Sequence, residues 1–192
     1  MHACAAWTGR TRQFDCTIRA RMHAHPPAAA QPASEFRVEK SRAEATLTLS
    51  NGMSMHGCFF VSGNSRTHAG PEGVKDVLNS ETGFVPFEVS RADGRATVLL
   101  HRDHIVFLEL ADGAEARRDP GYDVATERIA LMLLSNGTRL RGAVRVFRPK
   151  GRDRMSDFAR ADETFRYLEA GRATYVINVR HVLELAEEIA AP

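Results

Sequence analysis

The hydrophobic pattern of residues 45–62 predicts two β-strands joined by a tight hairpin. Apolar and polar residues alternate over 45–50, which is the period of a strand with one buried face. Asn51 and Gly52 follow, and this pair readily adopts the positive φ angles of a two-residue hairpin. In the next strand, 53–62, alternation places Gly57 on the same face as Phe59. A glycine there permits the strand to bend sharply.

The same pattern occurs twice in the chain. Ser50-Asn51-Gly52 returns as Ser135-Asn136-Gly137, with a leucine before each copy and a glycine five residues after Gly52 and after Gly137. Equivalent positions are 85 residues apart at these hairpins, 81 apart at Phe84 and Phe165, and 77 apart at His104 and His181. The second copy is therefore shorter by two small loop deletions. A repeat of this kind indicates a duplicated structural unit.

Each copy is expected to form five short strands and one short helical turn. In the first copy the helical turn is expected near 73–79, and the later strands near 84–89, 95–101 and 105–110. The second-copy strands are expected near 129–135, 138–148, 164–169, 173–178 and 181–185. Five strands around a glycine-bent hairpin predict a mostly β fold of two tandem SH3-like barrels. Since 129–134 is apolar throughout, this strand is expected to be covered on both faces, with the barrels packed together.

The composition divides the chain into four parts. Residues 1–35 are rich in alanine, arginine, histidine and proline without apolar periodicity, which predicts a disordered tail. The first barrel is expected over 36–110 and the second over 127–192. Gly113, Arg117-Arg118 and Asp119-Pro120-Gly121 indicate a linker over 111–126.

Charge and cysteine content exclude several classes of protein. The net charge of +2 does not demand a polyanionic partner. Three cysteines without a C-x-x-C pair argue against a disulfide framework and a zinc site, and favour a reducing cytoplasm. No run approaches the ~18 apolar residues of a membrane span. We expect neither a metal nor another cofactor, and no membrane partner.

Two motifs carry a resemblance to a known family. The segments 49–57 and 134–142, each a leucine, a polar residue, Asn-Gly, four residues and a glycine, resemble the first motif of the Sm-like family. Residues 136–142 and 179–182 look most like the RNA chaperone Hfq, and the tandem arrangement resembles an uncharacterised bacterial two-repeat family. The resemblance implies Sm-like SH3-like barrels, and it implies that Arg180 and His181 contact RNA.

The second copy also carries a basic stripe. Seven of the sixteen residues 139–154 are basic and only Asp153 is acidic, which predicts a positive field able to attract phosphates. The alternative is a solvated strand face paired with acids such as Asp157, Asp162 and Glu163. The candidate phosphate- or RNA-binding residues are Arg139, Arg141, Arg145, Arg148, Lys150, Arg180 and His181.

No pattern indicates catalysis or metal binding. Cys58 is expected to point outward with no base beside it, and no nucleophile-elbow, Walker or dinucleotide motif occurs. Three-residue spacing on a strand is expected to send the rings of His101 and His104 to opposite faces. The equivalent aspartates Asp76 and Asp157 are expected to cap short helical turns.

The sequence therefore favours a non-enzymatic binding or assembly module. Small barrels expose edge strands that pair with other copies or with a partner peptide, so a dimer or small ring is expected. One alternative is RNA or nucleotide-phosphate binding through the basic face of the second barrel. Another is cyclic-dinucleotide sensing through the arginines of residues 145–154.

Overall fold

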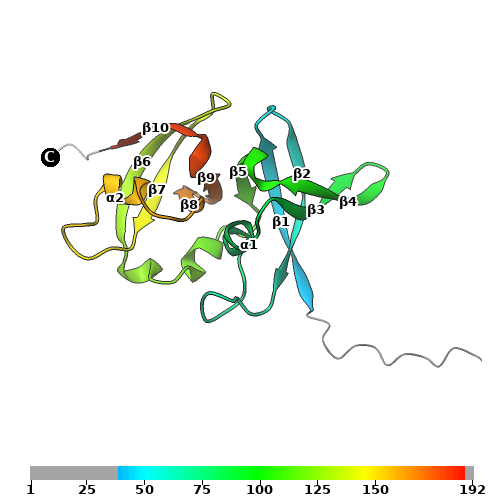
Figure 1. Ribbon diagram of the computed structural model, residues 1–192, viewed down its shortest axis with the longest axis horizontal. Helices are drawn as coiled ribbons and strands as arrows, with labels where there is room; N and C mark the ends of the chain where they lie inside the picture. Colours follow the sequence, from blue (N-terminus) through cyan, green and yellow to red (C-terminus); the bar gives the residue numbers. More distant parts are fainter. Residues whose placement is uncertain (1–38, 189–192) are drawn as a thin grey trace, which may run out of the picture. The chain divides into compact units, whose positions relative to one another are not determined.

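The protein is mostly β, as the sequence predicts. The structure, a computed structural model, describes residues 39–188. The tail expected over residues 1–35 lies outside the described residues. Figure 1 shows strands throughout, with two short helices and a few single turns between them.

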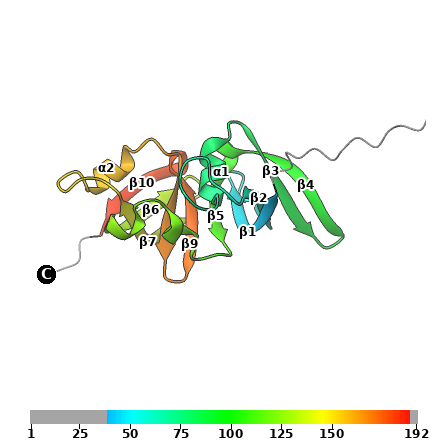
Figure 2. The same cartoon turned by 90° about the horizontal axis from the view of Figure 1, so that it is seen from below.

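The first repeat follows the order that the hydrophobic pattern predicts. Its elements are β1 (Lys40–Leu49), β2 (Ser54–Ser62), α1 (Val74–Ser80), β3 (Phe84–Arg91), β4 (Gly94–His101), the 3-10 turn η1 (Arg102–His104) and β5 (Ile105–Leu110). Asp76 caps α1 as expected, because its carboxylate accepts a hydrogen bond from the backbone N–H of Gly73. In Figure 2 the β3–β4 ribbon extends away from the rest of this repeat.

The second repeat has the same elements in the same order. They are β6 (Thr126–Leu134), β7 (Arg139–Val146), α2 (Met155–Ala159), β8 (Phe165–Ala170), β9 (Ala173–Asn178), η4 (Val179–His181) and β10 (Val182–Glu187). Two 3-10 turns, η2 (Glu115–Arg118) and η3 (Tyr122–Val124), lie between the repeats. The equivalence of the repeats is therefore structural, and it allows each residue to be compared with its counterpart.

All ten strands belong to one open antiparallel sheet. Their order is β10-β6-β7-β8-β9-β5-β1-β2-β3-β4, so each repeat has the same internal order and the repeats meet where β5 pairs with β9. Two closed barrels, which the sequence analysis expected, are not observed in this pairing. The first strand of the order, β10, and the last, β4, remain as open edges.

Both hairpins form where the Asn-Gly pairs predict them. Gly52 has φ of 82° and Gly137 has φ of 83°, a region that only glycine enters without strain. The Asn51 side chain accepts a hydrogen bond from the Met53 N–H at 3.0 Å, and Asn136 accepts one from the Thr138 N–H at 3.1 Å. The two turns are thus held by the same local bonds.

Gly57 and Gly142 allow the sheet to bend over itself in each repeat. A Cβ atom on Gly57 would lie 2.0 Å from the carbonyl oxygen of Glu88, and one on Gly142 would lie 2.6 Å from that of Glu169. The ladders at these bends are short, with β2 paired to β3 at only two residues. The glycines are required because the backbone of the next strand occupies the space of a side chain.

Gly57→Ala is expected to lower the free energy of unfolding by about 1–3 kcal/mol or more, because backbone atoms must move to admit the methyl group. Urea unfolding followed by circular dichroism measures the change. Gly63→Ala is the control, since a Cβ there meets nothing within 4 Å, and it should stay within about 0.5 kcal/mol of wild type. Equal stability of the two variants would contradict the role given to Gly57.

The two hydrophobic cores interlock across the junction of the repeats. The first core contains Phe165 and Val176 of the second repeat beside its own Phe59 and Phe87. The second core contains Val106 of the first repeat. The expectation that β6 is covered on both faces is wrong, because Leu131 is 41% exposed. The repeats join edge to edge rather than face to face.

Candidate functional site

The basic stripe begins on β7, where the sequence predicts it, but two of its arginines, Arg141 and Arg145, are paired with acids. Arg141 Nε donates to Glu188 Oε2 at 2.6 Å, a bond that lowers the pKa of Glu188. Arg145 lies 2.7 Å from Glu127 Oε2 and 3.5 Å from Glu169 Oε2. The acids expected from the sequence, Asp157, Asp162 and Glu163, are not the partners.

Arg145 is further held by an aromatic ring. Its guanidinium carbon lies 4.3 Å from the centre of the Tyr122 ring, and Nη2 donates to the Tyr122 hydroxyl at 3.1 Å. This arginine therefore fastens the η3 turn to β7. Within residues 39–188, no acid lies at ion-pair distance from Arg139, Arg148 or Lys150, which are exposed.

The remaining two candidate residues, Arg180 and His181, contact the first repeat instead of the stripe. Arg180 Nη1 lies 3.1 Å from Asp103 Oδ1, and His181 Nε2 lies 2.8 Å from the Asp103 carbonyl oxygen. His181 Nδ1 also lies 2.7 Å from Ser135 Oγ. The equivalent pair in the first repeat is His104 Nδ1 and Ser50 Oγ, 3.1 Å apart. Sequence analysis missed that these groups lie at a junction.

The junction itself is a four-residue antiparallel ladder between β5 and β9. Its partners are Phe107 with Ile177, Leu108 with Val176, Glu109 with Tyr175, and Leu110 with Thr174. Figure 1 shows these two strands side by side between the repeats. The junction therefore continues the sheet through backbone hydrogen bonds.

Three apolar side chains seal this junction completely. Val106 of β5 enters the second core, while Phe165 and Val176 of the second repeat enter the first core. All three are 0% exposed. Full burial of such side chains stabilises the junction by about 1.5–3 kcal/mol each.

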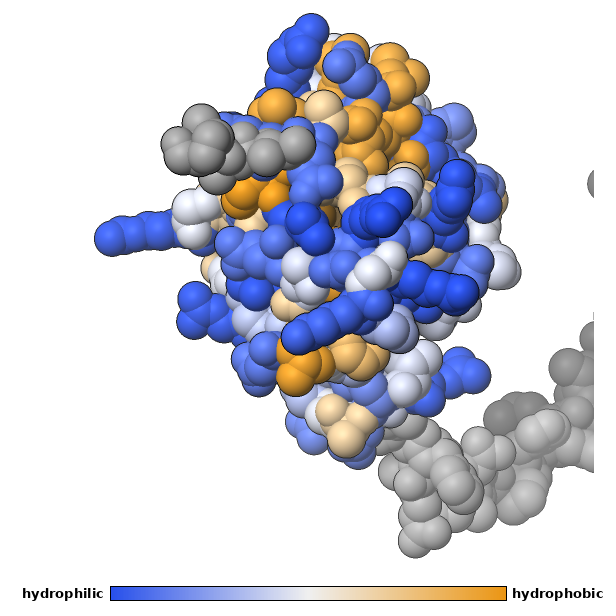
Figure 3. Space-filling model, turned by 90° about the vertical axis from the view of Figure 1, so that its left-hand side faces the viewer, coloured by the Kyte–Doolittle hydropathy of each residue, from blue (hydrophilic) through white to orange (hydrophobic). Residues whose placement is uncertain are grey.

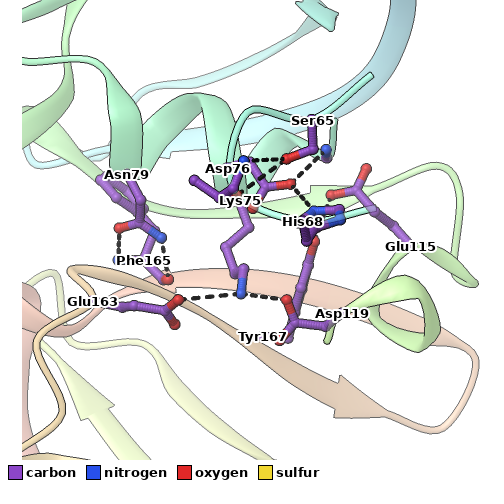
Figure 4. A network of polar contacts seen from close by, with 12 residues as sticks. Ser65, His68, Lys75, Asp76, Asn79, Glu115, Asp119, Glu163, Phe165 and Tyr167 are labelled. Atoms are coloured by element: carbon purple, nitrogen blue, oxygen red, sulfur yellow. Dashed lines mark hydrogen bonds and ion pairs between the residues drawn. The ribbon is translucent and has the colours of Figure 1, made fainter. Parts of the chain in front are cut away.

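A polar network around α1 reinforces the junction (Figure 4). Lys75 is buried, and its Nζ lies 2.5 Å from Asp119 Oδ1 and 3.5 Å from Glu163 Oε1. Burial alone would lower the pKa of Lys75, but Asp119 and Glu163 outweigh it and the pKa is raised. Asn79 accepts from the backbone N–H of Phe165 at 3.0 Å and donates to its carbonyl at 2.9 Å.

Glu115 belongs to the same network and is also buried. Its Oε1 accepts from the Val74 N–H and from the Tyr167 hydroxyl, both at 2.9 Å. Burial raises the pKa of Glu115 and of Tyr167. These bonds give a backbone N–H in the first turn of α1 its hydrogen-bond acceptor and connect α1 to β8. Glu115 therefore holds α1 in position at the junction.

His68 holds the loop before α1 in place. Its Nε2 lies 2.9 Å from Asp76 Oδ2, and its Nδ1 lies 3.1 Å from the Ala69 carbonyl oxygen. The bond to Asp76 raises the pKa of His68, since acceptors at both nitrogens favour the doubly protonated ring. The stability that this contact contributes is therefore present at acid pH and is lost as the pH rises through the pKa of the folded state.

A cavity of about 430 Å³ lies beside this network, lined by residues of both repeats. Three of its cations are already engaged by the protein: Lys75 by two carboxylates, Arg145 by Glu127, and Arg166 by the backbone carbonyls of Phe158, Ala161 and Glu163. Arg148 also lines the cavity and has no such partner within the described residues. The three engaged cations thus help to hold the repeats and the α2 segment together.

Cys58 and the pair of His101 and His104 lie in other surroundings than the sequence predicts. Cys58 belongs to neither hydrophobic core, which agrees with its place on the face opposite Phe59, but it is not exposed: it is buried, its Sγ lies 3.7 Å from Glu88 Oε1, and burial raises its pKa. The rings of His101 and His104 do not diverge, because η1 interrupts the strand and their centres are 5.7 Å apart. Over residues 39–188 no group of three or more histidine, cysteine or acidic side chains is arranged to hold a metal ion.

The counterparts of the junction residues are exposed on the open edges β4 and β10 and on β3 beside β4. Val106, Phe165 and Val176 correspond to Leu183, Phe84 and Leu99, at the repeat offsets of 77, 81 and 77. These counterparts are 68%, 60% and 66% exposed. Figure 3 faces the end of the molecule that carries β10, β6 and α2, and shows a hydrophobic area near its top. The same structural positions are therefore buried at one junction and open at the two edges.

Comparison of the chain with protein-family models, with curated proteins and with solved structures finds no match. Among the described residues, no helix has the length and apolar character to cross a membrane. The two repeats can be compared with each other, residue by residue, at the buried junction and at the open edges.

Proposed function

We propose that this chain is a non-enzymatic assembly module that associates head to tail with copies of itself. In this proposal each repeat is a small Sm-like, SH3-like unit, which is supported by the shared strand order, the Asn-Gly hairpins and the glycine bends at Gly57 and Gly142. The β10 edge of one copy pairs with the β4 edge of the next.

One observation carries the proposal: the exposed Leu183, Phe84 and Leu99 are the equivalents of the side chains that seal the β5–β9 junction. An open strand edge next to large exposed apolar side chains is unfavourable in water and is usually covered. A second copy supplies the matching surface, because it presents the same β4 and β10 edges.

The internal ladder also supplies the expected register between copies. We replace each residue of the β5–β9 ladder by its equivalent in the other repeat to obtain the ladder between copies. In that ladder Glu184 pairs with Leu100, Leu185 with Leu99, Ala186 with Val98, and Glu187 with Thr97. The equivalents of Tyr175 and Phe107 are Val98 and Glu184, so the aromatic contact between those two rings has no counterpart at the joint. The intermolecular joint is then the less tightly packed of the two.

The charges near the η turns also suit a head-to-tail arrangement. Asp103 and Arg180 are equivalent residues of opposite sign, and they already form an ion pair within the chain. At a joint between copies, Arg180 of one copy lies beside Asp103 of the next. Positive and negative charges therefore alternate along the assembly. A head-to-tail interface produces a ring when its rotation closes and a filament when it does not.

The phosphate-binding alternatives are weaker. Arg141, Arg145 and Arg180 are each paired with an acid of the chain, so a nucleic acid or a cyclic dinucleotide would have to displace those partners. Aromatic rings that stack on unpaired bases are also scarce around the stripe, where Tyr122 is covered by Arg145.

The oligomeric state tests the proposal. Light scattering coupled to size exclusion is expected to show a mass that is a multiple of the chain mass at tens of micromolar and neutral pH. The apparent mass should fall on dilution, because the joint between copies lacks the Lys75 and Asn79 contacts: the equivalent residues are Ser156 and Arg160. A monomer over the whole concentration range overturns the proposal.

A further inference from the structure

The junction strand β9 and its equivalent at the open edge, β4, end in different side chains that make the same local bond. Asn178 ends β9 and His101 ends β4, and the two positions are equivalent. Asn178 Oδ1 accepts from the Arg180 N–H at 3.1 Å, and His101 Nδ1 accepts from the Asp103 N–H at 3.3 Å. Each side chain thereby caps the 3-10 turn that follows it.

Asn178 has a second role at the junction within the chain. It is fully buried, and its Nδ2 donates to the carbonyl oxygen of Ile105 on β5 at 2.9 Å. This bond crosses from the second repeat to the first. An amide side chain does both tasks at once, because it carries an acceptor and a donor.

His101 has the same two functional groups only when it is neutral. Since Nδ1 accepts a hydrogen bond, the single ring proton resides on Nε2. Within the described part of the chain, Nε2 has no hydrogen-bond partner. The ring is half-buried and packs edge-on against Phe84, with the ring centres 5.1 Å apart.

We propose that His101 Nε2 donates to the backbone carbonyl of Val182 in the neighbouring copy, and that this bond makes the assembly sensitive to pH. Val182 is the equivalent of Ile105, so the bond copies the one that Asn178 makes. The inference rests on the head-to-tail assembly proposed above and adds its regulation: the joint forms with neutral His101 and weakens when His101 is protonated.

Protonation disrupts the joint for two reasons. An imidazolium ion carries N–H groups on both nitrogens, so Nδ1–H would face the Asp103 N–H and the cap of η1 would be lost. The assembled joint also surrounds the ring with Phe84 and apolar residues of the neighbouring copy. Burying a charge there without an acid beside it is unfavourable.

The charged groups around His101 do not offset this effect. On η1, the Asp103 carboxylate is bound by Arg180 at 3.1 Å, and Arg102 adds a positive charge. Glu184 of the neighbouring copy is expected opposite Leu100, whose side chain points to the face opposite His101. The contact between His104 Nδ1 and Ser50 Oγ can persist in either charge state of the ring. Ser50 Oγ donates a hydrogen bond to Nδ1 when this nitrogen carries no proton, and it accepts one from Nδ1 in the imidazolium ion, in which Nε2 is also protonated.

The experiment compares sedimentation velocity of the full chain at pH 7.5 and 5.5, at one ionic strength, with circular dichroism to check the fold. Histidine side chains gain their charge in this pH range, so loss of the proposed bond should raise the dissociation constant of the wild type by about tenfold. His101→Asn, which copies the side chain of the internal junction, should stay assembled at both pH values. His56→Gln, on the exposed side of β2, should respond as the wild type does.

The outcomes separate this inference from the function on which it rests. A wild type that is monomeric at pH 7.5 overturns both. A wild type that assembles equally at both pH values overturns the role of His101 alone, as does His101→Asn that still dissociates at pH 5.5. His68 cannot produce the expected dissociation, because its contact with Asp76 is strengthened at acid pH. Should His101→Asn misfold, His101→Gln offers the same pair of functional groups.

Discussion

Leu99→Lys is expected to convert the proposed assembly into monomers, and Leu183→Lys is expected to do the same. Each leucine is exposed on an open edge, so neither change harms the fold of the single chain. At the proposed joint each side chain is buried, and losing that burial costs about 1.5–3 kcal/mol before the buried ammonium group is counted. The dissociation constant should therefore rise at least about 100-fold, which light scattering at tens of micromolar detects.

A mixing experiment shows whether the joint is head to tail. Leu99→Lys keeps an intact β10 edge, and Leu183→Lys keeps an intact β4 edge. An equimolar mixture of the two variants should therefore form heterodimers through one intact joint, although each variant alone is monomeric. A symmetric joint between two like edges would give no such dimer. Val124→Lys, on an exposed turn away from both edges, is the control and should assemble as the wild type does.

Phe165→Ala is expected to lower the free energy of unfolding by about 3–5 kcal/mol, because this ring is fully buried in the core of the other repeat. Phe84→Ala removes the equivalent ring, which is exposed on β3 beside the open edge β4. In the monomeric Leu183→Lys background it should change stability by less than about 1 kcal/mol, and in the wild-type background it should weaken assembly. Urea unfolding followed by circular dichroism provides the stabilities.

This pair of variants is a matched test of the repeat. The same residue type occupies the same place in two equivalent units, and only the presence of a neighbouring strand differs. Similar losses of stability for Phe84→Ala and Phe165→Ala in the monomer would show that the single chain already covers Phe84, and would remove the main support for the joint.

Most of the secondary structure could be predicted because its causes are local. Alternation over 45–50 and the Asn51-Gly52 pair determine β1, its hairpin and β2, and the repeat transfers that prediction to β6 and β7. The expectation for Gly57 was also correct, since only a glycine lets the backbone of Glu88 approach so closely. These features depend on neighbouring residues and on the period of a strand.

The candidate site was harder to predict because its partners are distant in sequence. Arg141 pairs with Glu188, which is 47 residues later in the chain, and Arg180 pairs with Asp103, which is 77 residues earlier. The density of positive charge along 139–154 is visible in the sequence, but the acids that neutralise part of it come from other strands. A count of charges within the segment therefore overstated the free positive surface.

The sequence by itself determined that the chain contains one β unit twice, where its strands and hairpins lie, and which glycines its bends need. Only the tertiary structure decided that the units join through β5 and β9, so that Phe165 is buried while the equivalent Phe84 is exposed. The reason is physical: strand edges pair through backbone groups that every sequence has, so side-chain patterns do not specify which edge meets which. Burial at such a joint is a property of the pair of strands rather than of either one.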